Sequence, residues 1–503
     1  MGKVSVQSRL LEYSIMKKNG FLWNVLKLVS GTTVAQLITV ICAPILARLY
    51  SPEDYGAYNI FISCVSLVSG ILCLGYEMAI LLPDEDGEAA SLFWGSFGTA
   101  LFVVALTLPF VIWGKDWIAQ AINFPELSRY LWLLPISLLF GGINYGHPIL
   151  NYWATRRNHF GKLATARIVS TICTIFLQLI AGIVGPGLGK GLIIAAIAGG
   201  AISAILLFTQ LWREDGSFLI DHFDLQRIIK GLTRYRKFPL YDSWTTLINY
   251  ASWLLPSFLL ARYFSLKEVG LYGFTIRFLA IPMVLIGSAI AQVFTKQAVS
   301  AKAEGRLANL LENVLRSLIA FGMFPMLVIG MIAPSLFKVI FGPQWVEAGV
   351  YAQIIVVWMI VWFVSTPLFN VFYVFEKQDY YLAFSIIVFI LGCVALVVGG
   401  MLGNARWALA LFALSGILTH GYALIKIVFD CGVPLSRVKA IIFNYIIKFL
   451  PAGIIILVAI LLKATDLMQL ALAGLALAIY LYFEARSIPQ IQGLFLRLRV
   501  SVS

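Results

Sequence analysis

Three charged residues interrupt or border long apolar runs, which makes them candidates for binding or coupling chemistry. Arg277 lies inside the run GFTIRFLAIP, Glu77 lies inside LGYEMAILLP, and Asp242 opens a third run in YRKFPLYDSW. An ionisable side chain within a membrane costs about 2.5–3.5 kcal/mol on insertion scales, so it is a functional candidate by default. The structural alternative is an interhelical ion pair. A guanidinium at Arg277 suits an anionic group, and we expect Glu77 and Asp242 to act as gate or coupling residues.

Two further arginines belong to an internal repeat. Leu46–Ile60 reads LARLYSPEDYGAYNI, and Leu260–Phe274 reads LARYFSLKEVGLYGF. At a constant offset of 214 residues, the Leu-Ala-Arg, the Ser, the Gly and the Tyr coincide. The repeat therefore pairs Arg48 with Arg262. Each is expected about one helical turn inside the outer end of its half of the protein, where a cation suits an anionic ligand.

The remaining repeat residues also have a structural interpretation. Ser51-Pro-Glu-Asp54 fits a helix start, with Ser as N-cap, Pro at the first helical position and acids in the first turn. Ser265-Leu-Lys-Glu268 fits a capping box. Gly56 and Gly270 allow the helix that follows to pack closely on a neighbour.

The elements that position these residues must lie in a membrane. The 503-residue chain is 60% hydrophobic and only 12% charged, whereas soluble domains carry about 25% charged residues. This composition excludes a soluble enzyme or a nucleic-acid-binding protein, despite the net charge of +13. The six cysteines and four histidines show no metal-binding spacing, so we expect no metal and no cofactor.

About fourteen apolar runs are long enough to cross a bilayer, and they must be helices because lipid leaves no other way to satisfy the backbone. An even number of spans puts both termini on one side. Roughly 24 Lys and Arg lie in the loops of that side against roughly nine opposite, so the positive-inside rule makes it cytoplasmic. The acidic loop Pro83–Glu88 (PDEDGE) is an exception on that side. The expected spans begin near Leu28, Gly56, Ser91, Tyr130, Ala164, Leu192, Leu240, Leu271, Asn313, Val350, Tyr380, Trp407, Ile446 and Leu467.

Six spans separate the two repeat copies, so both halves have the same orientation in the membrane, as in parallel-repeat transporters. The sequence therefore predicts an all-α polytopic protein with two parallel six-helix lobes around a central cavity and two extra C-terminal helices. The expected divisions are a cytoplasmic N-terminus (1–27), an N-lobe (28–211), a cytoplasmic amphipathic linker (212–238), a C-lobe (239–429), a linker with the last two helices (430–486) and a cytoplasmic tail (487–503).

Motifs for covalent or nucleotide chemistry are missing. The stretch GPGLGKG at Gly185–Gly191 fails as a phosphate-binding loop, because Val184 stands where its first Gly should be and Gly191 where Ser or Thr should be. There is no HExxH, GxSxG or DxD sequence. The chain is therefore not expected to be an enzyme, and ATP-driven transport would need a separate subunit.

Several segments together resemble the Wzx-type polysaccharide or O-antigen flippases of the multidrug/oligosaccharidyl-lipid/polysaccharide exporter superfamily. The resemblance runs over nearly the whole chain. One departure is Gly75-Tyr76-Glu77, where the family often has Arg-Tyr-Glu. The segments are PILARLYSPEDYGAYNIF at Pro44–Phe61, YEMAILLPDEDGEAA at Tyr76–Ala90, the stretch Tyr235–Phe274, APSLFKVIFGPQWVEAGVYAQ at Ala333–Gln353 and STPLFNVFYVFEKQD at Ser365–Asp379.

The resemblance implies a cargo, an oligosaccharide unit on a polyprenyl diphosphate, moved by alternating access from the cytoplasmic to the outer leaflet of the bacterial inner membrane. It implies a role in O-antigen, capsule or exopolysaccharide assembly. Membrane lipids, a glycan polymerase and a chain-length regulator are the other implied partners, and nucleic acid is not one. Arg277, Arg48 and Arg262 then become candidates to contact the diphosphate.

Three alternatives stay open at this point. A drug or cation antiporter of the same architecture would need an acidic cavity, whereas the candidate residues here include Arg277. A lipid II flippase would share the fourteen spans. A polytopic glycan polymerase or ligase would need an outer loop that holds catalytic Arg or His, and the expected outer loops are short.

Overall fold

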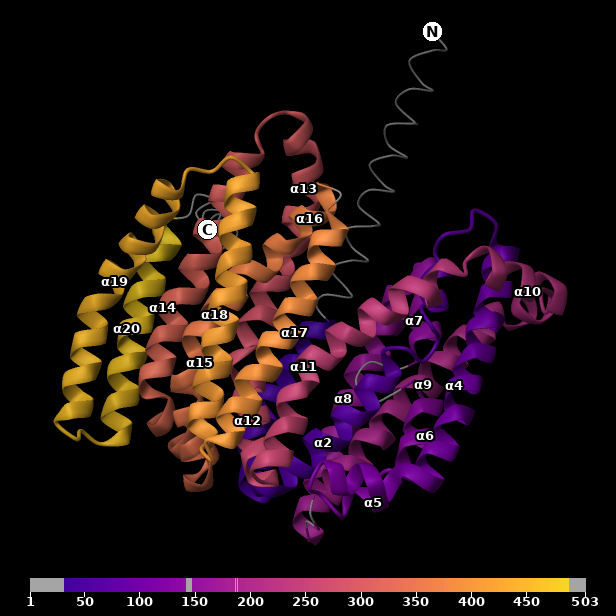
Figure 1. Ribbon diagram of the computed structural model, residues 1–503, viewed down its shortest axis with the longest axis horizontal. Helices are drawn as coiled ribbons and strands as arrows, with labels where there is room; N and C mark the ends of the chain where they lie inside the picture. The colour runs from indigo at the N-terminus through magenta and orange to yellow at the C-terminus, as the bar shows by residue number, and fades with distance from the viewer. Residues whose placement is uncertain (1–30, 142–146, 186, 188, 376, 488–503) are drawn as a thin grey trace, which may run out of the picture. The chain divides into compact units, whose positions relative to one another are not determined.

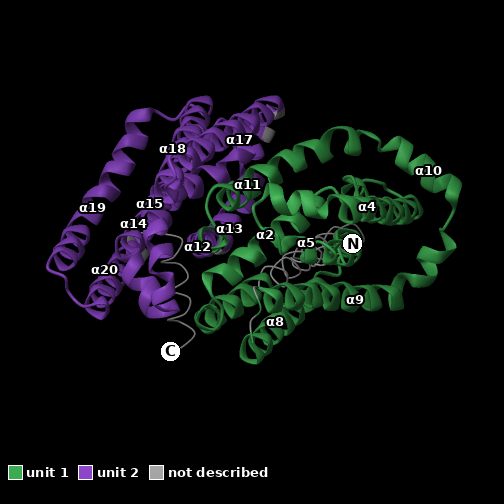
Figure 2. Ribbon diagram, turned by 60° about the horizontal axis from the view of Figure 1, so that its bottom comes forward, with its two compact units in different colours: residues 1–270 green, residues 271–503 purple. Residues whose placement is uncertain are grey.

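The computed structural model describes residues 31–141, 147–185, 187, 189–375 and 377–487, and every regular element in this part of the chain is a helix (Figure 1). The expected N-terminal segment 1–27 lies outside the described residues, as does nearly all of the expected tail 487–503. The contacts within the chain divide into two compact units, residues 1–270 and 271–503, coloured separately in Figure 2. We describe each unit by itself.

Unit 1 begins with the helix Gly31–Leu49 and includes three long helices that pack with shorter ones. Its core forms where α8 packs along α9 and where α10 and α6 pack on α4. The helices are α2 (Pro52–Ser69), α3 (Tyr76–Ala79), α4 (Asp86–Ala121), α5 (Leu127–Tyr130), α6 (Leu133–Leu139), α7 (Pro148–Arg156), α8 (Phe160–Val184), α9 (Lys190–Asp221), α10 (Leu225–Arg234), the π-helix η1 (Phe238–Asp242), α11 (Ser243–Tyr263) and the start of α12 (Leu266–Leu279).

Unit 2 is centred on α14, which packs against α15, α19 and α20. Small residues allow this close approach: Gly349 of α15 faces the α14 backbone at Pro334, and Gly399 of α17 faces Ala408 of α18. The elements are η2 (Met283–Gly287), α13 (Ser288–Ala303), α14 (Leu307–Phe341), η3 (Pro343–Trp345), α15 (Val346–Ser365), η4 (Thr366–Phe369), α16 (Asn370–Val374), α17 (Gln378–Met401), α18 (Ala405–Asp430), α19 (Leu435–Leu461) and α20 (Asp466–Ser487).

Ten helices among the described residues are long and apolar enough to cross a membrane. They confirm the predicted all-α polytopic membrane fold, and they coincide with ten of the expected spans. The other four expected spans, those beginning near Gly56, Tyr130, Leu240 and Leu271, correspond to shorter or interrupted helices.

Local sequence explains these interruptions. After α2 the chain turns through Leu74 and Gly75, whose φ angles of 53° and 78° lie in the left-handed region, before α3 begins. Pro239 lies within η1 and Pro282 directly precedes η2, consistent with proline removing a helical hydrogen bond and local π geometry accommodating the change. Discontinuous helices in transporters are the usual carriers of binding sites.

The start of α2 is fixed by one buried carboxylate. The backbone N–H and the hydroxyl of Ser51 donate to Asp54 Oδ2 at 2.9 and 2.8 Å, and Ser51 Oγ accepts from the Asp54 N–H. The other oxygen, Oδ1, accepts from the backbone N–H of Gly189 at 2.6 Å, immediately before α9. The predicted helix start is therefore confirmed, and the same side chain also joins α2 to α9.

We expect Asp54→Ala to lower the free energy of unfolding by about 2 kcal/mol or more, because it leaves buried N–H donors without their acceptor. Thermal unfolding of the purified protein in one detergent would measure the loss. Glu53→Ala is the matched control, since it removes an acid from the same helical turn. An equal loss in both variants would show that the helix dipole, and not the carboxylate contacts, provides the stabilisation.

Candidate functional site

Four of the five residues singled out in the sequence lie on the interrupted helices. Glu77 belongs to α3, Asp242 ends η1, and Arg262 lies in the last turn of α11. Arg277 lies in α12, before the break at Pro282. Arg48 is the exception, in the helix Gly31–Leu49. The structure places Arg277 in unit 2 and the other four in unit 1.

These residues differ sharply in exposure. Arg48, Arg262, Arg277 and Asp242 are exposed, as expected of groups that meet a ligand or solvent. Glu77 is buried, with only 8% of its surface exposed, and its Oε2 atom has no hydrogen-bond partner among the described residues. A buried carboxylate oxygen without a partner is costly, and such groups call for an explanation beyond packing.

Two of the predicted residues, Glu77 and Asp242, lie on neighbouring elements, because α3 packs against η1. Gly75, at the start of α3, approaches Phe238 so closely that an added Cβ would lie 3.3 Å from the Phe238 Cβ. Phe238 begins η1, the π-helix that Asp242 ends. The helix α7 also packs against α3. Glu77 thus lies on a short helix that packs against a π-helix, an element that can change geometry locally.

The two repeat copies pack against each other within unit 1. An added Cβ at Gly56 would collide with the carbonyl oxygen of Leu266, and an added Cβ at Gly270 would collide with the carbonyl oxygen of Pro52. Because the repeat pairs Gly56 with Gly270 and Pro52 with Leu266, this contact is reciprocal. Each copy starts its helix with the same backbone bond, from Tyr55 to Ser51 and from Val269 to Ser265. The glycines therefore let two equivalent helix starts meet backbone to backbone.

The acidic loop that contradicts the positive-inside trend has a structural purpose that the sequence did not indicate. Asp86 accepts hydrogen bonds from Arg156 at 2.8 Å and from Arg157 at 2.8 Å. Arg156 also donates to the carbonyl oxygens of Ile80 and Pro83, so it closes the loop that follows α3. The loop is therefore tied to α7 by the arginines that follow the fourth expected span.

This network continues to the end of α9. Arg157 donates to Asp215 Oδ1 at 2.8 Å, and the Trp153 indole donates to Asp215 Oδ2 at 3.0 Å. Lys162 pairs with Glu214 at 2.5 Å. Burial of the ring and, to a smaller extent, the charge of Lys162 lower the pKa of His159. The network therefore contains three cations and three carboxylates, so its charges balance, and we call it the arginine–aspartate network. Its members are Arg156, Arg157 and Lys162 with Asp86, Asp215 and Glu214.

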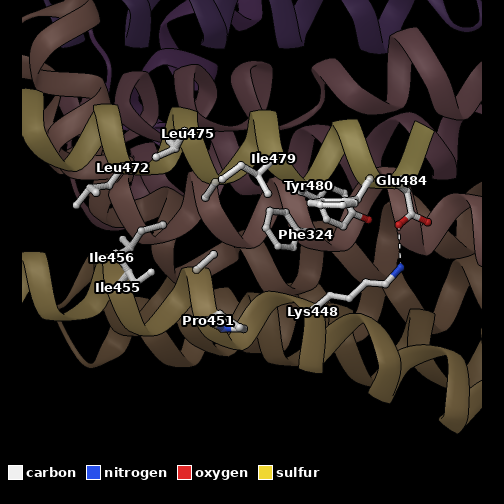
Figure 3. Close-up of a pocket in the computed structure, with 13 residues that line it drawn as sticks. Phe324, Lys448, Pro451, Ile455, Ile456, Leu472, Leu475, Ile479, Tyr480 and Glu484 are labelled. Atoms are coloured by element: carbon white, nitrogen blue, oxygen red, sulfur yellow. Dashed lines mark hydrogen bonds and ion pairs between the residues drawn. The ribbon is translucent and has the colours of Figure 1, made fainter. Parts of the chain in front are cut away.

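Unit 2 contains an apolar groove that the sequence did not reveal. The groove encloses about 490 Å³ between α19 and α20, with α14 behind it (Figure 3). Phe324 and Tyr480 stack with their ring centroids 3.9 Å apart, and Tyr480 donates to the Ala320 carbonyl oxygen at 2.7 Å. The rest of the lining is mostly aliphatic and includes Ile455, Ile456, Leu472, Leu475 and Ile479.

One end of the groove is polar. Lys448 of α19 and Glu484 of α20 form an ion pair at 2.8 Å, drawn as a dashed line in Figure 3. The Tyr445 hydroxyl donates to the same carboxylate at 2.6 Å, and Glu484 is only 5% exposed. From Leu472 to Glu484 the groove follows α20 for about 18 Å at the helical rise of 1.5 Å per residue. Its shape suits a long hydrocarbon chain with a polar group at one end.

The described part of the chain contains no group of three or more His, Cys, Asp or Glu side chains that could hold a metal ion.

Comparison with known proteins gives three kinds of match. A family model described as "Polysaccharide biosynthesis protein" matches residues 45–350. The succinoglycan biosynthesis transport protein ExoT of Rhizobium meliloti (strain 1021) is 26% identical over 338 residues, which are 65% of this chain and 63% of that protein. The chain thus matches less than two thirds of that relative's length.

Solved structures share the fold at low sequence identity. The lipid II flippase MurJ, in an inward closed conformation, matches with a TM-score of 0.67 and 14% identity over 91% of this chain and 99% of MurJ. A multidrug resistance MATE family transporter of the MOP superfamily, in an inward-facing conformation, matches with a TM-score of 0.64 and 14% identity, over 81% of this chain and 96% of the transporter. These likenesses confirm the fold.

We expect Gly56→Ala and Gly270→Ala each to weaken the contact between the repeat copies, because the added methyl group must push a backbone carbonyl away. The free energy of unfolding, measured by thermal unfolding, should fall by about 1–3 kcal/mol in both variants, as at other overpacked sites. Gly98→Ala is the matched control, because a Cβ there meets nothing within 4 Å. Similar stability for all three variants would show that the close approach contributes nothing.

Proposed function

This chain belongs to the family of polysaccharide biosynthesis proteins, and we propose that it is the flippase for an oligosaccharide unit carried on a polyprenyl diphosphate. The chain is a multi-pass membrane transport protein of polysaccharide biosynthesis, and it is not an enzyme. Its fold is that of the MOP superfamily. The proposed movement runs from the cytoplasmic to the outer leaflet by alternating access, for O-antigen, capsule or exopolysaccharide assembly.

The observation that carries this proposal is the apolar groove of unit 2. A polyprenyl chain is a long hydrocarbon with a polar group at one end, and the groove offers a largely aliphatic wall that ends at the Lys448–Glu484 ion pair. Burial of hydrocarbon contributes about 25 cal/mol for each Å² removed from water, but a chain that leaves lipid gains only the better packing. The groove therefore favours orientation of the tail over strong retention, which suits a cargo that must leave.

Arg277 of unit 2, and Arg48 and Arg262 of unit 1, are each proposed to contact the diphosphate, because their exposed guanidinium groups are suited to phosphate oxygens. Glu77 and Asp242 are the proposed gate or coupling residues. The unpartnered Glu77 oxygen supports this role, since a change in its protonation or pairing would alter the contact between α3 and η1. The name of the 26% identical relative, a succinoglycan biosynthesis transport protein, supports a polysaccharide unit as the class of cargo.

The proposed orientation places both termini in the cytoplasm of a bacterial cell. It rests on the excess of Lys and Arg in the loops of that side. It also agrees with the direction of transport, because outward movement of a negative charge through an inside-negative potential is favourable by about 2.3 kcal/mol per charge per 100 mV.

We expect Ala476→Trp to reduce translocation at least several-fold, because the indole would fill the groove between α19 and α20. Ala478→Trp is the control, two residues along the same helix at an exposed position that does not line the groove. Leaflet-specific labelling of the lipid-linked glycan in cells that express each variant would measure translocation. Equal translocation in both variants would remove the groove from the transport path.

We expect Arg277→Ala to cause cytoplasmic accumulation of the lipid-linked glycan in the same assay, while Arg277→Lys retains part of the activity because it keeps the charge. Normal membrane insertion is the condition for the comparison. Unchanged export by Arg277→Ala would contradict its contact with the diphosphate. Normal translocation with failed polymerisation in a deletion strain would instead favour a glycan polymerase.

A further inference from the structure

Three lysines of unit 2 gather around one aspartate and one aromatic ring where α13, α16, α17 and α18 end or begin. Lys377 and Lys426 bind the two oxygens of Asp430, at 2.9 and 2.7 Å. Lys302 and Lys377 both lie over the ring of Phe375, at 4.7 and 5.7 Å from its centroid. We call these three side chains, with Asp430 and Phe375, the lysine cluster.

The cluster has more positive than negative charge, and its positive groups face outward. The Asp430 side chain is only 9% exposed, whereas those of Lys377 and Lys426 are 41% and 32% exposed. An ammonium group has three N–H donors, and Asp430 takes one from each of its two lysines. Lys302 donates to the Val374 carbonyl oxygen at 2.8 Å and meets no carboxylate within the cluster. Donors therefore remain on all three ammonium groups.

Among the described residues, no ion pair joins a second carboxylate to these three lysines, and Glu304, close to Lys302 in the sequence, pairs with Arg306 instead. Asp379, the next acid along the described chain, is exposed in the first turn of α17, where the positive helix end stabilises it. The arginine–aspartate network of unit 1, in contrast, balances three cations with three carboxylates. A dianionic ligand therefore finds unsatisfied positive charge at the lysine cluster and not at that network.

We propose that the lysine cluster is a capture site for the diphosphate of the cargo on the cytoplasmic side, before the headgroup enters the transport path. The segments that carry Lys302, Lys377 and Lys426 are all expected on that side by the charge bias of the loops. Asp430 positions Lys377 and Lys426 as a pair, as a diphosphate with two negative charges requires, and Lys302 adds the third cation across Phe375. This inference rests on the proposed function for the identity of the cargo, but binding itself can be tested without transport.

The test is binding of inorganic pyrophosphate and of geranylgeranyl diphosphate to the purified full-length protein in phosphatidylcholine nanodiscs, measured by calorimetry at two salt concentrations. We expect the triple variant K302Q/K377Q/K426Q to bind both ligands at least tenfold more weakly, with a smaller salt dependence. The double variant K377R/K426R should bind within about threefold of the unaltered protein because it keeps the charges. Lys439→Gln, at an exposed lysine outside the cluster, should bind normally.

Asp430→Asn gives a result that a purely structural role would not produce. Removal of the carboxylate releases two ammonium groups, so we expect tighter binding of pyrophosphate, provided that the variant stays monodisperse. Weaker binding by a folded Asp430→Asn variant would overturn the proposal, and so would unchanged binding by the triple lysine variant.

Two further outcomes separate this proposal from the proposed function. If Arg437→Gln weakens binding while the lysine variants do not, the anion binds at the exposed Arg437–Glu312 pair instead, and the capture site is wrong. If the lysine variants lose pyrophosphate binding but glycan translocation in cells is absent even for the unaltered protein, the anion site stands and the flippase function fails. An unaltered protein that binds neither ligand overturns the capture site.

Discussion

The backbone contact between the two repeat copies is the constraint on which much of unit 1 depends. Two helix starts can meet at carbonyl distance only if neither has a side chain there, and Gly56 and Gly270 provide this condition reciprocally. Asp54 then holds the first of these helix starts to α9 through Gly189. One duplicated sequence motif therefore sets a helix start, a helix crossing and a link to a third helix.

Much of the fold was predictable, because lipid forces long apolar runs to be helices and the hydropathy pattern records them directly. The broken helices were less predictable: apolar content does not show that α2 stops at Gly70 and that η1 and η2 adopt π geometry. The repeat offset predicted a duplicated element, but only the structure shows that its glycines face each other. The boundaries of the two lobes stay predictions.

Some residues of the candidate site could likewise be predicted from the sequence, and others could not. Glu77 could be found because a carboxylate in an apolar run is conspicuous, and its burial agrees with that interpretation. The groove could not be found, because its walls are ordinary aliphatic residues of α19 and α20 whose meaning depends on which faces meet. The lysine cluster was also hidden, since Lys302, Lys377 and Lys426 look in the sequence like cytoplasmic topology signals and come together only through Asp430 and Phe375.

The attachment of α19 and α20 has a consequence for how such proteins can diversify. These two helices pack on unit 2 mainly through α14, and they lie beyond residues 45–350, the segment that the family model matches. The other main helix pairs of unit 2, α14 with α15, α15 with α18 and α17 with α18, do not involve them, so α19 and α20 form an attachment to this set of helices. Under the proposed function, a hybrid that carried these two helices from another transporter would change its preference for lipid chain length while the rest of unit 2 stayed unaltered.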